Sequence, residues 1–151
     1  MRQPTNTVLN YRTEESSDSF SGGVTMNVND YSPLALAFIG DAHYNMIVKR
    51  HVIDHEVKMD RMQKLATKYV SAKAQARIME HLLQLDILTE EEIDYYKRGR
   101  NTKAHKAPRN TDPVTYHVST GFEALWGYWY LNGDEARMKQ IWDLIETMEE
   151  S

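Results

Sequence analysis

Residues 118–131 read VSTGFEALWGYWYL, a strongly apolar stretch that is interrupted by a single carboxylate, Glu123. Asp112 and Pro113 stand a few residues before it, and this pair is typical of a helix start, because the aspartate can accept an orphan N–H and proline has none to lose. Gly133 marks the stop. The sequence therefore predicts one long helix that ends at about residue 131.

A second apolar stretch with one embedded carboxylate lies earlier in the chain. Residues 34–48 read LALAFIGDAHYNMIV and contain Asp41. Ser32 and Pro33 again form a cap and first-turn pair, which predicts a helix that continues to about Val52. Glycine costs about 1 kcal/mol in mid-helix relative to alanine. Gly40 therefore indicates that another backbone or helix comes close at this point.

The other segments also have helical spacing. A short helix is predicted over residues 60–69, and Ser71 can cap the next one. Thr89 with Glu92 forms a capping box that opens a further helix, which we expect Gly99 to end. A final amphipathic helix begins near Asp134, and strand-like alternation is absent. We predict an all-α fold with six or seven helices and no internal repeat.

Length and composition restrict the class of protein. The 151 residues fit one domain, which we place at residues 30–151 behind a flexible tail of residues 1–29. The absence of cysteine excludes disulfide scaffolds, thiolate zinc sites and cysteine nucleophiles, and is compatible with the cytoplasm. No apolar run reaches the roughly 18 residues of a membrane span, so we expect no membrane insertion.

Charge is distributed unevenly along the chain. The formal net charge is −4, yet residues 1–30 and 132–151 together carry −6 and residues 31–131 carry +2. The segment KRGRNTKAHKAPR, residues 97–109, contains only basic charges. Alone it is most simply a solvated loop, but guanidinium groups suit phosphate oxygens. The candidate phosphate-binding residues in it are Lys97, Arg98, Arg100, Lys103 and Lys106.

The two embedded carboxylates, Asp41 and Glu123, are the strongest candidates for chemistry. A carboxylate in an apolar helix is costly unless it is paired, solvated or bound to a metal, so a structural role and a site are about equally compatible with the pattern. Tyr116, Thr120 and Glu123 share one stripe of their helix. If the two helices cross near their glycines, the carboxylates meet and offer the oxygen ligands that Mg²⁺ prefers.

The histidines give weaker signals. His51, Asp54 and His55 have helical spacing, but the predicted helix ends there and no second cluster accompanies them. A metal site at this position is therefore disfavoured, and hydrogen-bonded or exposed histidines are the simpler interpretation for the whole chain.

Several motifs together resemble a known family. LALAFIGDA (34–42) resembles the signature helix of ribonuclease III domains, and TGFEALWGYWYL (120–131) resembles their second catalytic helix. VSAKAQARI (70–78), KRGRN (97–101) and PRNTD (108–112) are similar to Mini-III, the short bacterial branch that lacks the double-stranded-RNA-binding domain. The resemblance covers roughly residues 31–148.

The resemblance implies a helical endonuclease domain, a symmetric homodimer and Mg²⁺-dependent cleavage of double-stranded RNA that leaves 5′-phosphates. It also implies a role in maturing precursor large-subunit ribosomal RNA, with a ribosomal protein as a candidate partner. Asp41 and Glu123 would be catalytic and would hold the metal, while Asn101 and Thr120 would position substrate or water. Longer family members have two further acids per site, and these positions are not acidic here, as in the Mini-III branch.

Two other classes of function remain open from the residues. The same fold could serve as a non-catalytic RNA-binding or ribosome-assembly module, in which case RNA would bind without being cut. A helical protein–protein adaptor would not need Arg98 and Arg100 for RNA binding. The retained pair of carboxylates favours the enzyme.

Overall fold

The computed structural model describes residues 27–102 and 106–150. Lys103 and most of the predicted tail, residues 1–26, lie outside the described residues. Two compact units are distinguished, residues 1–31 and 32–151. In the first, the described part contains a short 3-10 turn, η1 (Val28–Asp30).

The described residues of the second unit contain six α-helices. They are α3 (Pro33–Ile53), α4 (Met59–Val70), α5 (Ala72–Gln84), α6 (Glu90–Arg100), α7 (Pro113–Leu131) and α8 (Glu135–Glu150). No strand occurs in the described ranges 27–102 and 106–150. The predicted all-α class is therefore confirmed. Across the same ranges, no helix has the length and apolarity that a membrane span needs.

The predicted helix starts are confirmed by their hydrogen bonds. Each capping side chain accepts a bond from a backbone N–H three residues later, which satisfies one of the orphan donors of the first turn. The distances are 3.1 Å for Ser32, 3.1 Å for Ser71 and 3.0 Å for Asp112. Thr89 and Glu92 form both bonds of the predicted capping box.

The role expected of Gly99 is wrong. The helix α6 continues through Gly99 to Arg100, and Asn101 forms its C-terminal cap. Gly99 is buried against α7, where an added Cβ would lie 2.5 Å from the Ala124 Cβ and 3.2 Å from the Thr120 carbonyl oxygen. It is therefore a close-packing position between two helices rather than a helix end.

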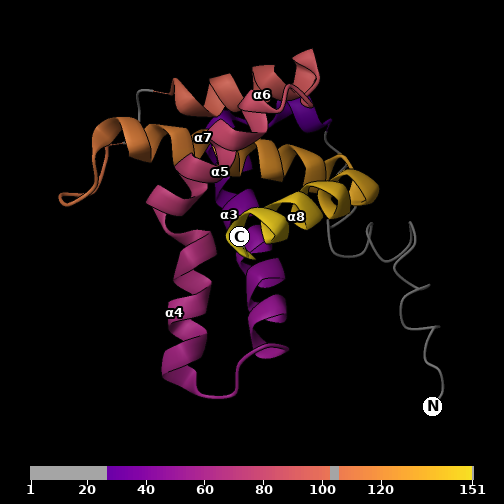
Figure 1. Ribbon diagram of the computed structural model, residues 1–151. Helices are drawn as coiled ribbons and strands as arrows, with labels where there is room; N and C mark the ends of the chain where they lie inside the picture. Colours follow the sequence, from indigo (N-terminus) through magenta and orange to yellow (C-terminus); the bar gives the residue numbers. More distant parts are fainter. Residues whose placement is uncertain (1–26, 103–105, 151) are drawn as a thin grey trace, which may run out of the picture. The chain divides into compact units, whose positions relative to one another are not determined.

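The helix α7 forms the centre of the unit. It packs against α3, α5, α6 and α8 and lies between these helices in Figure 1. Phe122, Leu125, Trp126 and Trp129 are fully buried along it. Because neighbours cover α7 on most sides, it is apolar almost all round rather than along one stripe.

The two long helices α3 and α7 cross with their main chains in contact. A Cβ on Gly40 would lie 1.9 Å from the Glu123 carbonyl oxygen, and a Cβ on Gly127 would lie 1.9 Å from the Leu36 carbonyl oxygen. Only glycine allows so close an approach. The prediction that another backbone reaches Gly40 is confirmed, and this crossing sets the position of the carboxylates described below.

A buried ion pair connects α6, α7 and α8. Glu92 accepts hydrogen bonds from Trp129 Nε1 at 2.8 Å and from Arg137 at 2.7 and 2.9 Å. Arg137 also donates to the Ile87 carbonyl oxygen at 2.7 Å. Burial alone raises the pKa of Glu92, but these hydrogen bonds outweigh it and hold the pKa below its usual value.

Candidate active site

A pocket of about 420 Å³ opens where α3 and α7 cross. Both embedded carboxylates line it, Asp41 from α3 and Glu123 from α7. Asp41 follows Gly40 directly, and Glu123 lies four residues before Gly127, so each acid is fixed by the close crossing of the two main chains. The remaining lining residues are Leu34, Ala37, Phe38, Tyr116 and Thr120.

The Asp41 side chain is exposed and is oriented by its own helix. Asn45, one turn later, donates from Nδ2 to Asp41 Oδ1 at 2.9 Å and to the Asp41 carbonyl oxygen at 2.8 Å. One carboxylate oxygen is thereby held against α3. The amide is neutral, so this contact adds no positive charge to the pocket.

The Glu123 carboxyl group is half-buried and has an unusual affinity for protons. Burial raises its pKa, contact with the Asp41 carboxyl group and the charge of Asp41 raise it further, and the result is a pKa of about 8. The Gln75 side chain acts in the opposite direction and lowers the pKa. Two facing carboxylates, one of them partly shielded from water, thus form a centre of negative charge that a proton or a cation would relieve.

The oxygen donors of this pocket fit a divalent cation. Mg²⁺ needs only one or two protein carboxylates, since it retains several waters and binds substrate phosphates. Within the part of the chain that the structure describes, no group of three or more His, Asp or Glu side chains is placed to hold a metal. Asp41 and Glu123 are therefore the pair of ligands that the pocket offers.

Thr120 and Tyr116 complete the polar wall on α7. Thr120 is buried, and its hydroxyl donates to the Tyr116 carbonyl oxygen at 3.0 Å. Burial raises the pKa of Tyr116, and the charge of Glu123 raises it further. Tyr116 was not predicted as a site residue, although the stripe it shares with Thr120 and Glu123 contained the signal.

The predicted basic residues lie outside this pocket. Lys97 and Arg98 are exposed at the end of α6, Arg100 is half-buried there, and Asn101 and Lys106 are exposed beyond it. Arg98 is bonded to Asp94 through Nε at 2.9 Å, and Arg100 donates to Asn101 Oδ1 at 3.0 Å. Since Gly99 touches α7 at Thr120, the end of α6 carries these residues to the level of the carboxylates along α7.

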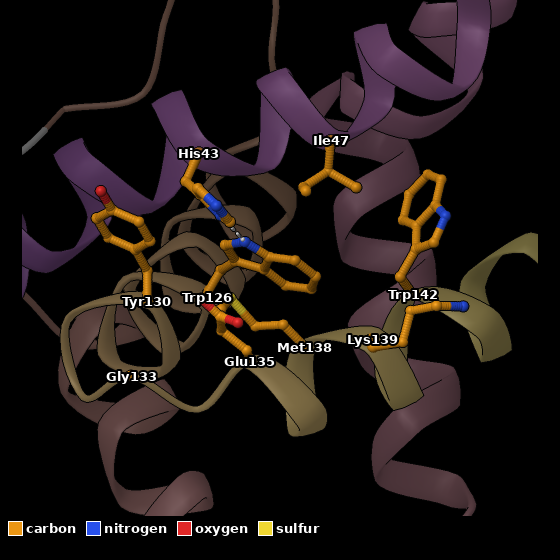
Figure 2. A pocket seen from close by; sticks show the side chains of 9 residues that line it. All are labelled: His43, Ile47, Trp126, Tyr130, Gly133, Glu135, Met138, Lys139 and Trp142. Atoms are coloured by element: carbon orange, nitrogen blue, oxygen red, sulfur yellow. Dashed lines mark hydrogen bonds between the residues drawn. The ribbon is translucent and has the colours of Figure 1, made fainter. Parts of the chain in front are cut away.

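His51 and His43 have structural partners, as expected, whereas His117 differs from the expectation because its Nδ1 is buried without a hydrogen-bond partner among the described residues. His51 pairs through Nδ1 with Glu146 at 2.9 Å, which connects α3 to α8. Trp126 Nε1 donates to His43 Nδ1 at 3.0 Å at the edge of a separate pocket of about 280 Å³, shown in Figure 2. Asp41 and His43 are two residues apart, about 200° around α3, so this pocket lies on another face from the carboxylates.

Comparisons with known proteins identify the family of this chain. Residues 34–134 match the model of the Ribonuclease III domain family. Mini-ribonuclease 3 of Streptococcus pneumoniae is 46% identical over 117 residues, which cover 77% of this chain and 91% of that protein. Mini-ribonuclease 3 of Enterococcus faecalis is 44% identical over 109 residues, which cover 72% of this chain and 83% of that protein. A crystal structure of a protein from Fusobacterium nucleatum superimposes with a TM-score of 0.72 at 29% identity, covering 83% of this chain and 99% of that one.

Proposed function

Because the chain belongs to the ribonuclease III domain family, in its Mini-ribonuclease 3 branch, we propose that it is an endoribonuclease that cleaves double-stranded RNA with a divalent cation, Mg²⁺. The observation that carries this proposal is the meeting of Asp41 and Glu123 in one pocket at the crossing of α3 and α7. The alternatives, a non-catalytic RNA-binding module and a protein adaptor, give no reason to keep two acids in contact.

Asp41 and Glu123 would hold the cation. When bound, Mg²⁺ supplies positive charge beside the scissile phosphate and makes a nearby water molecule more acidic. Asn45 keeps the Asp41 carboxylate turned toward the pocket, and Thr120 lies beside Glu123 where it can limit the position of substrate or water. Cleavage would release the ribose 3′ oxygen and leave a 5′-phosphate.

The basic residues at the end of α6 and after it would hold the RNA backbone. Lys97, Arg98 and Arg100 are carried to the level of the carboxylates by the contact of Gly99 with α7. Arg98 and Arg100 also lie over the rings of Tyr95 and Tyr96, at 4.3 and 5.4 Å, which restricts their side chains. Asn101 and Lys106 would extend this contact surface, and Lys103, which lies outside the described residues, is a further candidate from its place in the sequence.

The proposed active form is a homodimer. Phe38 lines the carboxylate pocket and is 82% exposed, which is unusual for so large an apolar side chain. We propose that the surface of α3 around Phe38 and Ile39 pairs with the same surface of a second copy. A two-fold axis there would direct the two sites at opposite strands of a duplex.

The proposed natural substrate is precursor large-subunit ribosomal RNA in the cytoplasm, with a ribosomal protein as a candidate partner. The support for this assignment is that the chain belongs to the Mini-ribonuclease 3 branch, for which the resemblance described above implies this substrate. Processing of that precursor can be compared in cells that carry the parent gene or a variant with Asp41 changed.

A cleavage assay on duplex RNA tests the central proposal. The parent protein should cut in Mg²⁺, whereas Asp41→Asn and Glu123→Gln should bind RNA and leave it intact. Equal cleavage by all three proteins would refute the site. Binding without cleavage by the parent would favour the RNA-binding module, and unchanged RNA binding after charge reversal at Arg98 and Arg100 would favour the adaptor.

A further inference from the structure

One buried polar group lies beside the site without a hydrogen-bond partner. Gln75 on α5 is only 1% exposed, and its Nε2 makes no hydrogen bond in the described part of the chain. Ala74, Ala76 and Ile78 of the same helix are also buried, so this part of α5 lies in the interior. Gln75 therefore faces the interior with an unused donor.

Leaving such a donor unpaired is costly. Burial takes the donor away from water without giving it a replacement hydrogen bond, whereas an apolar residue of similar size would lose no hydrogen bond at this place. Buried donors in folded proteins are nearly always paired, so an exception calls for a specific reason. The groups that surround the Gln75 amide should therefore include the acceptor that it uses.

The amide lies close to Glu123. The helix α5 packs against α7, and the Gln75 side chain already acts on the Glu123 carboxyl group by favouring its ionised form. The charge of Asp41 and burial act on the same carboxyl group in the opposite sense. Gln75 is thus a buried amide on the helix that packs beside Glu123.

We propose that Gln75 is a positioning residue for Glu123, whose side-chain amide donates a hydrogen bond to the ionised carboxylate and fixes its orientation toward the cation. The inference rests on the proposed function, since it assigns Glu123 as a ligand. A hydrogen bond from this amide to the Glu123 carboxylate would also satisfy the buried donor.

An amide is well suited to this task. A lysine or arginine at residue 75 would neutralise the carboxylate and compete with the cation, whereas a neutral donor orients the carboxylate and leaves its charge available. Asn45 has the same relation to Asp41, to which it donates at 2.9 Å. Each carboxylate would then accept a hydrogen bond from one uncharged amide: Asp41 from Asn45, and Glu123 from Gln75.

The test uses Gln75→Leu, which removes the donor and keeps the volume similar. Binding of Mg²⁺ to the full-length protein is measured by titration calorimetry, cleavage of duplex RNA gives kcat and KM, and urea unfolding in EDTA gives the stability. We expect Mg²⁺ affinity to fall about 10- to 100-fold, with lower kcat and unchanged KM for RNA. We expect the metal-free stability to be equal or higher, because an unpaired buried donor is removed.

Two comparisons make the result specific. Gln84→Leu is the matched control, since Gln84 is an exposed residue of the same helix, and it should leave Mg²⁺ affinity unchanged. In a Glu123→Gln background, Gln75→Leu should cause no further loss of Mg²⁺ affinity, because the ionised carboxylate that the amide would orient toward the cation is already absent. If Gln75→Leu does not fold, Gln75→Met is used in its place.

The outcomes separate this inference from the proposed function. Mg²⁺ affinity within two-fold of the parent in Gln75→Leu would overturn the inference, as would a loss of stability with unchanged affinity. Either result would leave the assignment of Asp41 and Glu123 intact. Unaltered Mg²⁺ binding and cleavage in Glu123→Gln would instead overturn the proposed function itself.

Discussion

Replacing Glu123 by glutamine should stabilise the metal-free protein. The parent carboxyl group has a pKa of about 8 in the folded protein, because burial and the neighbouring Asp41 disfavour its charge, against an ordinary value of 4.5. Between these two values the folded protein holds a proton that the unfolded chain has released, so parent stability falls as pH rises from 4.5 to 8. Glutamine does not ionise and avoids this loss.

The size of the effect follows from the two pKa values. Each unit of difference corresponds to about 1.36 kcal/mol, so the 2.5 units between 4.5 and 7 give about 3 kcal/mol at pH 7. Above pH 8 the full difference of 3.5 units gives about 5 kcal/mol as an upper limit. Below pH 4.5 the parent and Glu123→Gln should have nearly equal stability.

Urea unfolding followed by circular dichroism measures this difference. The parent and Glu123→Gln are compared in EDTA from pH 4 to pH 9 at one fixed protein concentration. Mg²⁺ should then stabilise the parent by about 2.7 kcal/mol at 100 times its dissociation constant and should have little effect on the variant. Glu80→Gln, at an exposed position of α5, is the control for loss of one negative charge.

The reasoning fails if the stability curves of the parent and Glu123→Gln run parallel over this pH range. Parallel curves would mean that the Glu123 carboxyl group is neither shielded from water nor affected by Asp41. A parent that gains no stability from Mg²⁺ would contradict the assignment of the pair as cation ligands.

Three further perturbations give distinct expected results. Gly127→Ala should lower the unfolding free energy by more than about 3 kcal/mol, seen as a reduced urea midpoint, because its Cβ would overlap the Leu36 carbonyl oxygen. Arg137→Met should cost about 3–5 kcal/mol in the same measurement, because it leaves the buried carboxylate of Glu92 without its cation. Arg98→Glu should weaken duplex RNA binding most at low salt and reduce the salt dependence measured by filter binding, and an unchanged slope would contradict the phosphate contact.

Features of the fold that depend on neighbours in the chain could be predicted from the sequence. Ser32, Thr89 and Asp112 each act on a backbone N–H three residues away, so the residue types alone identify the helix starts. Gly40 and Gly127 also indicated a close helix crossing. A glycine in mid-helix is unfavourable on its own, so Gly40 pointed to a contact with another part of the chain. That crossing led to the correct expectation that Asp41 and Glu123 meet.

Features that depend on distant contacts could not be predicted in the same way. Glycine is favoured both at a helix end and at a close contact between two helices, so the residue type of Gly99 does not distinguish the two roles. Only its packing against α7 identifies the second role. Glu92 was identified as half of a capping box, but its bond to Arg137, 45 residues away, has no local signature. Gln75 had a weak signal, as a polar residue among buried apolar neighbours in its helix.

The main-chain contact at Gly40 and Gly127 has a consequence for redesigning this enzyme. The spacing of Asp41 and Glu123 is set by two rigid backbones rather than by side chains that could repack. The basic residues that are proposed to hold RNA lie outside this crossing, so substitutions among them should leave the spacing of Asp41 and Glu123 unchanged. The distance between the two helices at the crossing cannot be tuned by substituting either glycine, because even the methyl group of alanine is too large for the available space.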